Sequence, residues 1–175
     1  MHKILRFIGL INAAVWLGSA VFVTIGLPVV FSKEVGVYVQ RPLVGIVAEN
    51  ILARYTVVQY CCAVIALFHL CAEHFLLGRK LVRNTLVLLL ALLAVALLNG
   101  VWLQPKMREL HKIKYWGPVP AAREQADRNF RIMHGVSQPA NLLVVAVLVI
   151  YVWKVGGPQN GSQRPRLSSL SKIES

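Results

Sequence analysis

Residues 132–154 read IMHGVSQPANLLVVAVLVIYVWK, a polar beginning that runs into an unbroken apolar stretch. At a helical rise of about 1.5 Å per residue, this stretch is long enough to cross the ~30 Å hydrocarbon core of a bilayer. Further stretches of similar length and composition precede it at residues 5–30, 52–76 and 82–103. The sequence therefore predicts an all-α membrane protein, an antiparallel bundle of four transmembrane helices.

The composition is typical of a membrane protein and not of a soluble domain. Hydrophobic residues make up 57% of the chain and charged residues 15%, whereas soluble domains have about 45–50% and about 25%. The formal net charge is +12, but the basic residues lie in loops and ends, without the surface pattern of a nucleic-acid-binding protein. We expect these residues to lie at lipid headgroups, with no nucleic acid as a partner.

The bundle is expected to occupy residues 1–155. Residues 156–175 are expected to form a disordered polar tail, because Gly, Pro, Ser, Asn and Gln dominate from there on. Residues 104–131 mix charges with apolar residues, which predicts an amphipathic connection between the third and fourth helices at the headgroups. The short basic segments favour both termini in the cytoplasm, in a cell or inner membrane.

Polar residues at spacings of three and four open the fourth helix, so they share one face. Polar groups inside a membrane are costly unless they face protein or water, so this face marks a candidate site. By helical rise, one amide of the second helix and one of the third reach the same half of the membrane, next to residues 104–131. We call this half the far side. The predicted far-side cluster consists of Gln59, Asn99, His134, Ser137, Gln138 and Asn141.

Two roles are open for this cluster. Its side chains can join helices through hydrogen bonds worth about 0.6 kcal/mol each, or they can bind a small polar solute or an ion. In either case, His134 and Asn99 are expected to converge beneath the long connection, because the third and fourth helices are joined there. The predicted function is therefore that of a non-catalytic membrane protein whose cluster either binds a solute or fixes the packing.

Enzyme chemistry and cofactors are not predicted. The chain shows no nucleophile beside a base and no glycine-rich phosphate loop. His69 and His134 lie in opposite halves of the membrane, so they cannot hold one haem between them. The cysteine spacings match no zinc signature, and no particular metal ion is assigned.

The first helix carries small residues four apart, Gly9 with Ala13 and Ala14 with Gly18, which allow another helix to approach closely. This small-residue face could pack against a protein partner or a second copy of the chain. The alternative function is accordingly an accessory or structural subunit of a larger membrane complex.

The second helix carries a polar stripe from Tyr55 to Glu73 that we expect to face the bundle. His69 and Glu73, four residues apart on this stripe, are predicted to interact or to share a partner on the near side, opposite the far side.

Two motifs resemble a known family. They are Asn99-x-x-Trp102-Leu103-x-Pro105 and Asn129-Phe130-x-x-x-His134-Gly135-x-Ser137-x-x-x-Asn141. In these motifs the chain resembles the small four-span proteins grouped with eukaryotic transmembrane protein 205, whose bacterial members were catalogued as a domain of unknown function. The resemblance covers most of residues 1–155 and implies a four-span membrane fold. It implies no particular activity, because the family has none assigned.

Overall fold

The computed structural model describes residues 2–78 and 83–157, and the secondary structure of these parts is helical. Two of the elements, labelled η, are π-helical turns inside longer helices. The elements are α1 (His2–Val21), η1 (Phe22–Gly26), α2 (Leu27–Val29), α3 (Lys33–Gly36), α4 (Arg41–Leu77), α5 (Arg83–Leu98), η2 (Asn99–Leu103), α6 (Gln104–Trp116) and α7 (Pro120–Gly156).

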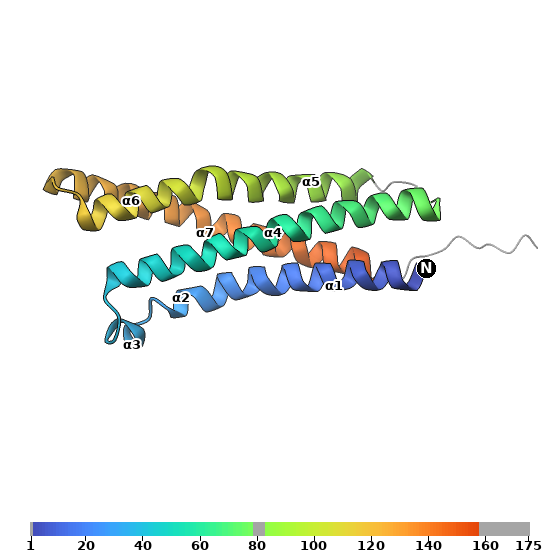
Figure 1. Cartoon of the computed structure of the whole chain (residues 1–175), viewed down its shortest axis with the longest axis horizontal. Coiled ribbons are helices and arrows are strands. Elements are labelled where there is room, and N and C mark those ends of the chain that lie inside the picture. The colour runs from blue at the N-terminus through green and yellow to red at the C-terminus, as the bar shows by residue number, and fades with distance from the viewer. Residues whose placement is uncertain (1, 79–82, 158–175) are drawn as a thin grey trace, which may run out of the picture.

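Continuous helices long and apolar enough to cross a membrane cover Lys3–Val29, Pro42–Leu76, Arg83–Trp116 and Pro120–Gly156. Figure 1 shows these helices side by side, with the N-terminus and the end of α7 at one end of the bundle. The α6–α7 turn and α3 lie at the other end. The predicted all-α bundle of four transmembrane helices is confirmed, and the predicted polar tail lies almost wholly outside the described residues.

The two longest helices exceed the thickness of a hydrocarbon layer. The helices α4 and α7 each have 37 residues, or about 55 Å, which exceeds the ~30 Å of hydrocarbon. In Figure 1, α6 and the first turns of α7 project beyond the beginning of α4. Asp127 of α7 forms ion pairs in this projecting part, with Lys114 of α6 at 2.6 Å and with Arg131 of α7 at 2.9 Å. The predicted amphipathic connection is thus α6 together with the beginning of α7.

The short helix α3 lies between α2 and α4 in the chain, at the far end of the bundle. The Ser32 hydroxyl accepts a hydrogen bond from the Val35 N–H and caps α3. Hydrogen bonds from the backbone and from Ser32 lower the pKa of Glu34 in its first turn.

The tightest packing lies in the near half, the half of the bundle that holds the N-terminus and the end of α7. Trp16 of α1 and Tyr151 of α7 meet edge to face with ring centroids 6.3 Å apart, and both rings and Leu148 are almost completely buried. The Asn12 amide donates to the Cys62 carbonyl at 2.9 Å. The small side chains that let α1 and α4 approach are Ala13, Ala63 and Ala66.

A glycine brings α4 against α1 in the near half. A Cβ at Gly9 would lie 2.6 Å from His69 Nε2, and the same nitrogen lies 2.9 Å from the Leu5 carbonyl oxygen. His69 is buried, as are Tyr55, Gln59 and the other members of the α4 stripe above it. The stripe therefore faces the bundle as predicted, whereas a pairing of His69 with Glu73 stays a prediction.

The small-residue face of α1 is divided between two surroundings. Gly9 and Ala13 are buried inside the bundle, whereas Ala14 and Gly18 are exposed on its outside. A Cβ at Gly18 would meet nothing within 4 Å. Part of the predicted interface thus serves the fold of the single chain, and the other part lies on the surface.

Both π-helical turns precede a proline. The Leu27 N–H donates to the Phe22 carbonyl, five residues back, directly before Pro28. The Gln104 N–H donates to the Asn99 carbonyl in the same way, directly before Pro105. Because a proline lacks an N–H and its ring crowds the carbonyl four residues back, the preceding turn widens.

Candidate ligand-binding cavity on the far side

A cavity of about 600 Å³ lies between the four long helices in the far half. Residues of η1, α2, α4, η2, α6 and α7, together with Phe31 after α2, contribute to its walls. The predicted cluster residues that line it are Asn99, His134, Ser137, Gln138 and Asn141. The structure therefore brings five of the six predicted residues to one cavity, with His134 and Asn99 both in its walls.

Gln59, the sixth predicted residue, does not line the cavity. It lies one turn deeper on α4 than Tyr55, and the Tyr55 side chain takes its place in the wall. The Gln59 amide donates to the Tyr55 hydroxyl at 2.9 Å. Among the described residues, the buried Gln59 Oε1 has no hydrogen-bond partner. Gln59 thus supports the wall from behind.

The α7 wall is a set of linked polar groups. The Gln138 amide lies 3.1 Å from His134 Nε2, and the Ser137 hydroxyl donates to the His134 carbonyl at 2.8 Å. The His134 ring stacks on Phe130, with ring planes 11° apart. Because His134 and Gln138 are exposed outside the bundle as well, the wall is also part of the outer surface.

The inner end of the cavity is closed by a bond between α7 and η1. The Asn141 amide donates to the Thr24 hydroxyl, and that hydroxyl donates to the Ala20 carbonyl at 2.7 Å. Sequence reasoning missed Thr24. The signal that could have found it is its position four residues before Pro28, where the widened turn presents its side chain.

The wall from η2 and α6 contributes two more amides. Gln104 donates through its amide to the Thr56 hydroxyl and to the Leu52 carbonyl, which leaves its own carbonyl oxygen able to accept. Asn99 is half-buried and makes no hydrogen bond with another side chain within the described ranges. These groups have hydrogen-bonding capacity left for a ligand.

Both π-helical turns line this cavity. The turn η1 places Val23 and Thr24 in the wall, and η2 places Asn99 and Leu103 there. Such turns occur frequently at functional sites because they redirect side chains that an α-helix would stack. The two prolines therefore shape the cavity as well as the helices.

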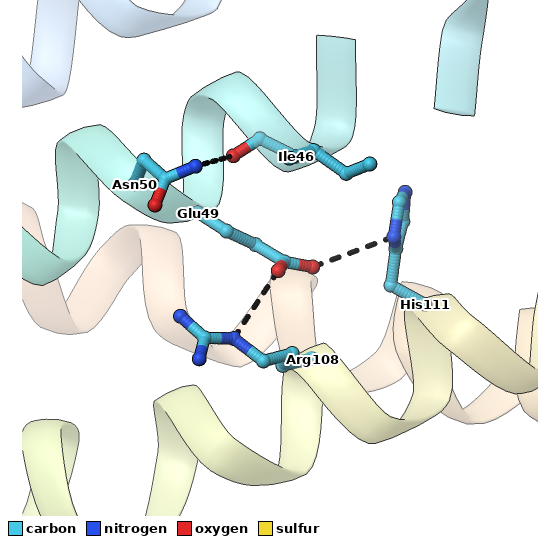
Figure 2. A network of polar contacts seen from close by, with 5 residues as sticks. All are labelled: Ile46, Glu49, Asn50, Arg108 and His111. Atoms are coloured by element: carbon cyan, nitrogen blue, oxygen red, sulfur yellow. Dashed lines mark hydrogen bonds and ion pairs between the residues drawn. The ribbon is translucent and has the colours of Figure 1, made fainter. Parts of the chain in front are cut away.

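The outer end of the cavity carries a compensated pair of charges, Glu49 and Arg108. Figure 2 shows Glu49 between Arg108 and His111, with Arg108 Nε 3.3 Å from one carboxylate oxygen and His111 Nδ1 3.4 Å from the other. A Cβ at Gly45 would clash with His111 Nε2. A glycine thus gives the histidine room here, as Gly9 does for His69.

The polar groups in the cavity walls are mostly hydrogen-bonding groups without charge. In residues 2–78 and 83–157, no group of three or more His, Cys, Asp or Glu side chains could hold a metal ion. Amides, hydroxyls and one imidazole provide the polar part of the walls. Such groups recognise a ligand by hydrogen bonds.

These features define a multi-pass membrane protein with a polar cavity on one side of its bundle. Residues 11–115, more than half of the chain, match the family described as a domain of unknown function (DUF4149), and the chain belongs to this family. The match includes the cavity walls from α4, η2 and α6 and ends before α7. No curated protein and no solved structure matches the chain. The match confirms a family of unknown function, whereas the predicted likeness to transmembrane protein 205 stays a prediction.

Proposed function

We propose that the protein is a non-catalytic binding protein of the membrane whose far-side cavity takes a small polar solute or an ion. The observation that carries this proposal is the lining of one cavity by Asn99 and the four polar residues of the α7 face. Its volume of about 600 Å³ lies within the range of about 300–1,000 Å³ usual for small-molecule sites.

The hydrogen bonds of the cavity support binding over a purely structural role. In the near half, Asn12 and His69 each contact a backbone carbonyl of a neighbouring helix, as groups that join helices do. In the far half, Gln104 makes such a contact with the Leu52 carbonyl but keeps its own carbonyl oxygen for another donor, and the Asn99 side chain has no hydrogen bond in the described part of the chain. A cluster that served only to join helices would use these groups.

An accessory subunit is the second candidate. The exposed pair Ala14 and Gly18 on α1 favours it, because small residues on an outer face allow another transmembrane helix to pack closely. A heterologous protein that copurifies in fixed proportion, and is lost in Gly18→Leu but not in Val15→Leu, would support this candidate.

Three finer assignments belong to the same proposal. We place the chain among proteins like transmembrane protein 205 on the motifs at residues 99–105 and 129–141. We assign it to a cell or inner membrane, and we place both termini in the cytoplasm on the basic residues near them.

The test uses the purified full-length protein and its His134→Gln variant. Mass spectrometry and metal analysis identify compounds that copurify, and thermal unfolding is then measured with added neutral polar solutes and mono- and divalent cations. We expect a compound that raises the melting temperature of the wild type but not that of His134→Gln, with both melting temperatures similar in its absence. Equal responses of the two proteins to every compound would contradict the proposal.

A further inference from the structure

Two chemically different walls face each other across the cavity. The wall from η1, α2 and the turn after α2 is apolar except for Thr24, and it includes Leu27 and Phe31. The opposite wall from α7 is polar, from His134 to Asn141. A ligand that contacts both walls must have an apolar side and a hydrogen-bonding side.

The cavity straddles the far boundary of the hydrocarbon layer. The near boundary is marked by Arg6, whose guanidinium donates to the Gly156 carbonyl at 2.8 Å. About 20 residues of helix cross the layer, which, counted from Arg6 and Gly156, places the far boundary near Gly26 on the first helix and near Val136 on α7. The lining residues of both helices lie on either side of these positions.

The cavity opens sideways toward lipid. Its exposed lining residues lie mainly on two elements, with Pro28 and Phe31 on one rim and Gln138 and Leu142 on the other. Figure 1 shows α1 and α7 side by side at the near end and apart at the far end. Within the hydrocarbon layer, the gap between these rims faces the bilayer.

The charge of the walls is balanced. The charged side chains in the walls are Glu49 and Arg108, which pair with each other. A ligand with a net charge would therefore enter without a free countercharge, and the burial of an unpaired charge costs several kcal/mol.

From these observations we infer that the ligand is an uncharged amphiphile that enters from the bilayer. Its hydroxyl or carbonyl groups bond to Asn99, Gln104 and the α7 face, and its apolar part lies along Leu27 and Phe31. This inference rests on the proposed function and narrows it, because it replaces a general polar solute or ion by a lipid-soluble, neutral molecule.

The test is photo-crosslinking in phosphatidylcholine nanodiscs that hold the full-length protein. The probes are a monoacylglycerol with a diazirine in its acyl chain and a lysophosphatidylglycerol with the same chain, which adds one negative charge. The labelled residues are mapped by mass spectrometry. We expect the uncharged probe to label cavity residues at least about tenfold more than the anionic probe. A tenfold difference in binding corresponds to about 1.4 kcal/mol, and the burial of an unpaired charge costs more than that.

Matched variants localise the labelling. Leu142 lines the cavity, whereas its neighbour Leu143 lies on the exposed face of α7 outside it. Labelling of the cavity by the uncharged probe should fall about tenfold in Leu142→Trp and stay unchanged in Leu143→Trp. Asn99→Leu, which removes a hydrogen-bonding group without filling the cavity, should also reduce it, and thermal unfolding shows that each variant is folded.

The remaining outcomes separate the two proposals. Equal or stronger cavity labelling by the anionic probe would overturn the uncharged amphiphile. Absence of labelling by both probes would also overturn it, and the proposed function would survive if a water-soluble solute or cation still distinguished wild type from His134→Gln. Equal labelling in Leu142→Trp and Leu143→Trp, with no such solute, would overturn both.

Discussion

The helix α7 passes through two different surroundings, a closely packed near half and a far half that borders a cavity. In the near half, no more than 2% of the surface of Leu148 or Tyr151 is exposed, and Tyr151 packs on Trp16 of α1. In the far half, His134 and Gln138 are exposed and line a cavity. One continuous helix therefore serves as a packing element at one end and forms a wall of the cavity at the other.

Polar groups join helices in both halves. In the near half, Asn12 donates to the Cys62 carbonyl of α4, and in the far half Gln104 donates to the Leu52 carbonyl and Asn141 to the Thr24 hydroxyl. The difference is that only the far half adds a row of exposed polar groups, such as Gln138 and His134, that bond to one another along one helix. Helices in lipid gain little from hydrophobic burial, so close packing must hold the bundle together. This packing is expected mainly in the near half, because the cavity interrupts it in the far half.

The largest expected effect comes from leucine truncation on α7. Leu148→Ala should destabilise the protein by about 2–3 kcal/mol, because it leaves a void in the close-packed near half. Leu142→Ala should cost less than about 0.5 kcal/mol, because Leu142 already borders open space. Unfolding by sodium dodecyl sulfate in mixed micelles measures both values, and equal losses would show that the two halves do not differ in packing.

A smaller effect is expected for glycines of α1. Gly9→Ala should destabilise by about 1–2 kcal/mol, because the new methyl group would displace His69 from the Leu5 carbonyl. Gly18→Ala is the control, since its methyl group would meet nothing within 4 Å. The same unfolding assay compares them, and a stable Gly9→Ala protein would mean that α1 and α4 are less closely packed than described.

The smallest effect concerns the bond that closes the inner end of the cavity. A double-mutant cycle of Asn141→Ala and Thr24→Val should give a coupling energy of about 0.6 kcal/mol, the average for hydrogen bonds between membrane helices. The control cycle pairs Asn141→Ala with Ser19→Ala, whose hydroxyl donates to the Trp16 carbonyl instead. Equal coupling in both cycles would argue against the Asn141–Thr24 bond.

Much of this organisation can be predicted from the sequence, because lipid imposes simple rules on long apolar helices. Spacings of three and four residues predicted the polar face of α7, and helical rise placed Asn99 beside it. Gln59 was assigned to the same cluster because depth along a helix does not reveal which side chain reaches the cavity. In the structure Tyr55 lines the cavity and Gln59 lies behind it.

Other features depend on tertiary structure. The pair of Glu49 and Arg108 joins residues far apart in the chain, and nothing local in either segment indicates the other. The π-helical turns were foreseeable only in part. Gly26 and Pro28 indicate a loosened turn, but their convergence with η2 on one cavity depends on how α1 and α5 pack with α4.

Thiol labelling measures whether water reaches a polar cavity in the far half of the bundle. Single cysteines are placed in a background in which the native cysteines are replaced by alanine, and their reaction rates with iodoacetamide are measured. Because the thiolate that reacts forms only where water is present, Ser137→Cys in the cavity should react at least about tenfold faster than Leu148→Cys in the core and Leu143→Cys toward lipid. A rate for Ser137→Cys as low as that of Leu148→Cys would contradict the account.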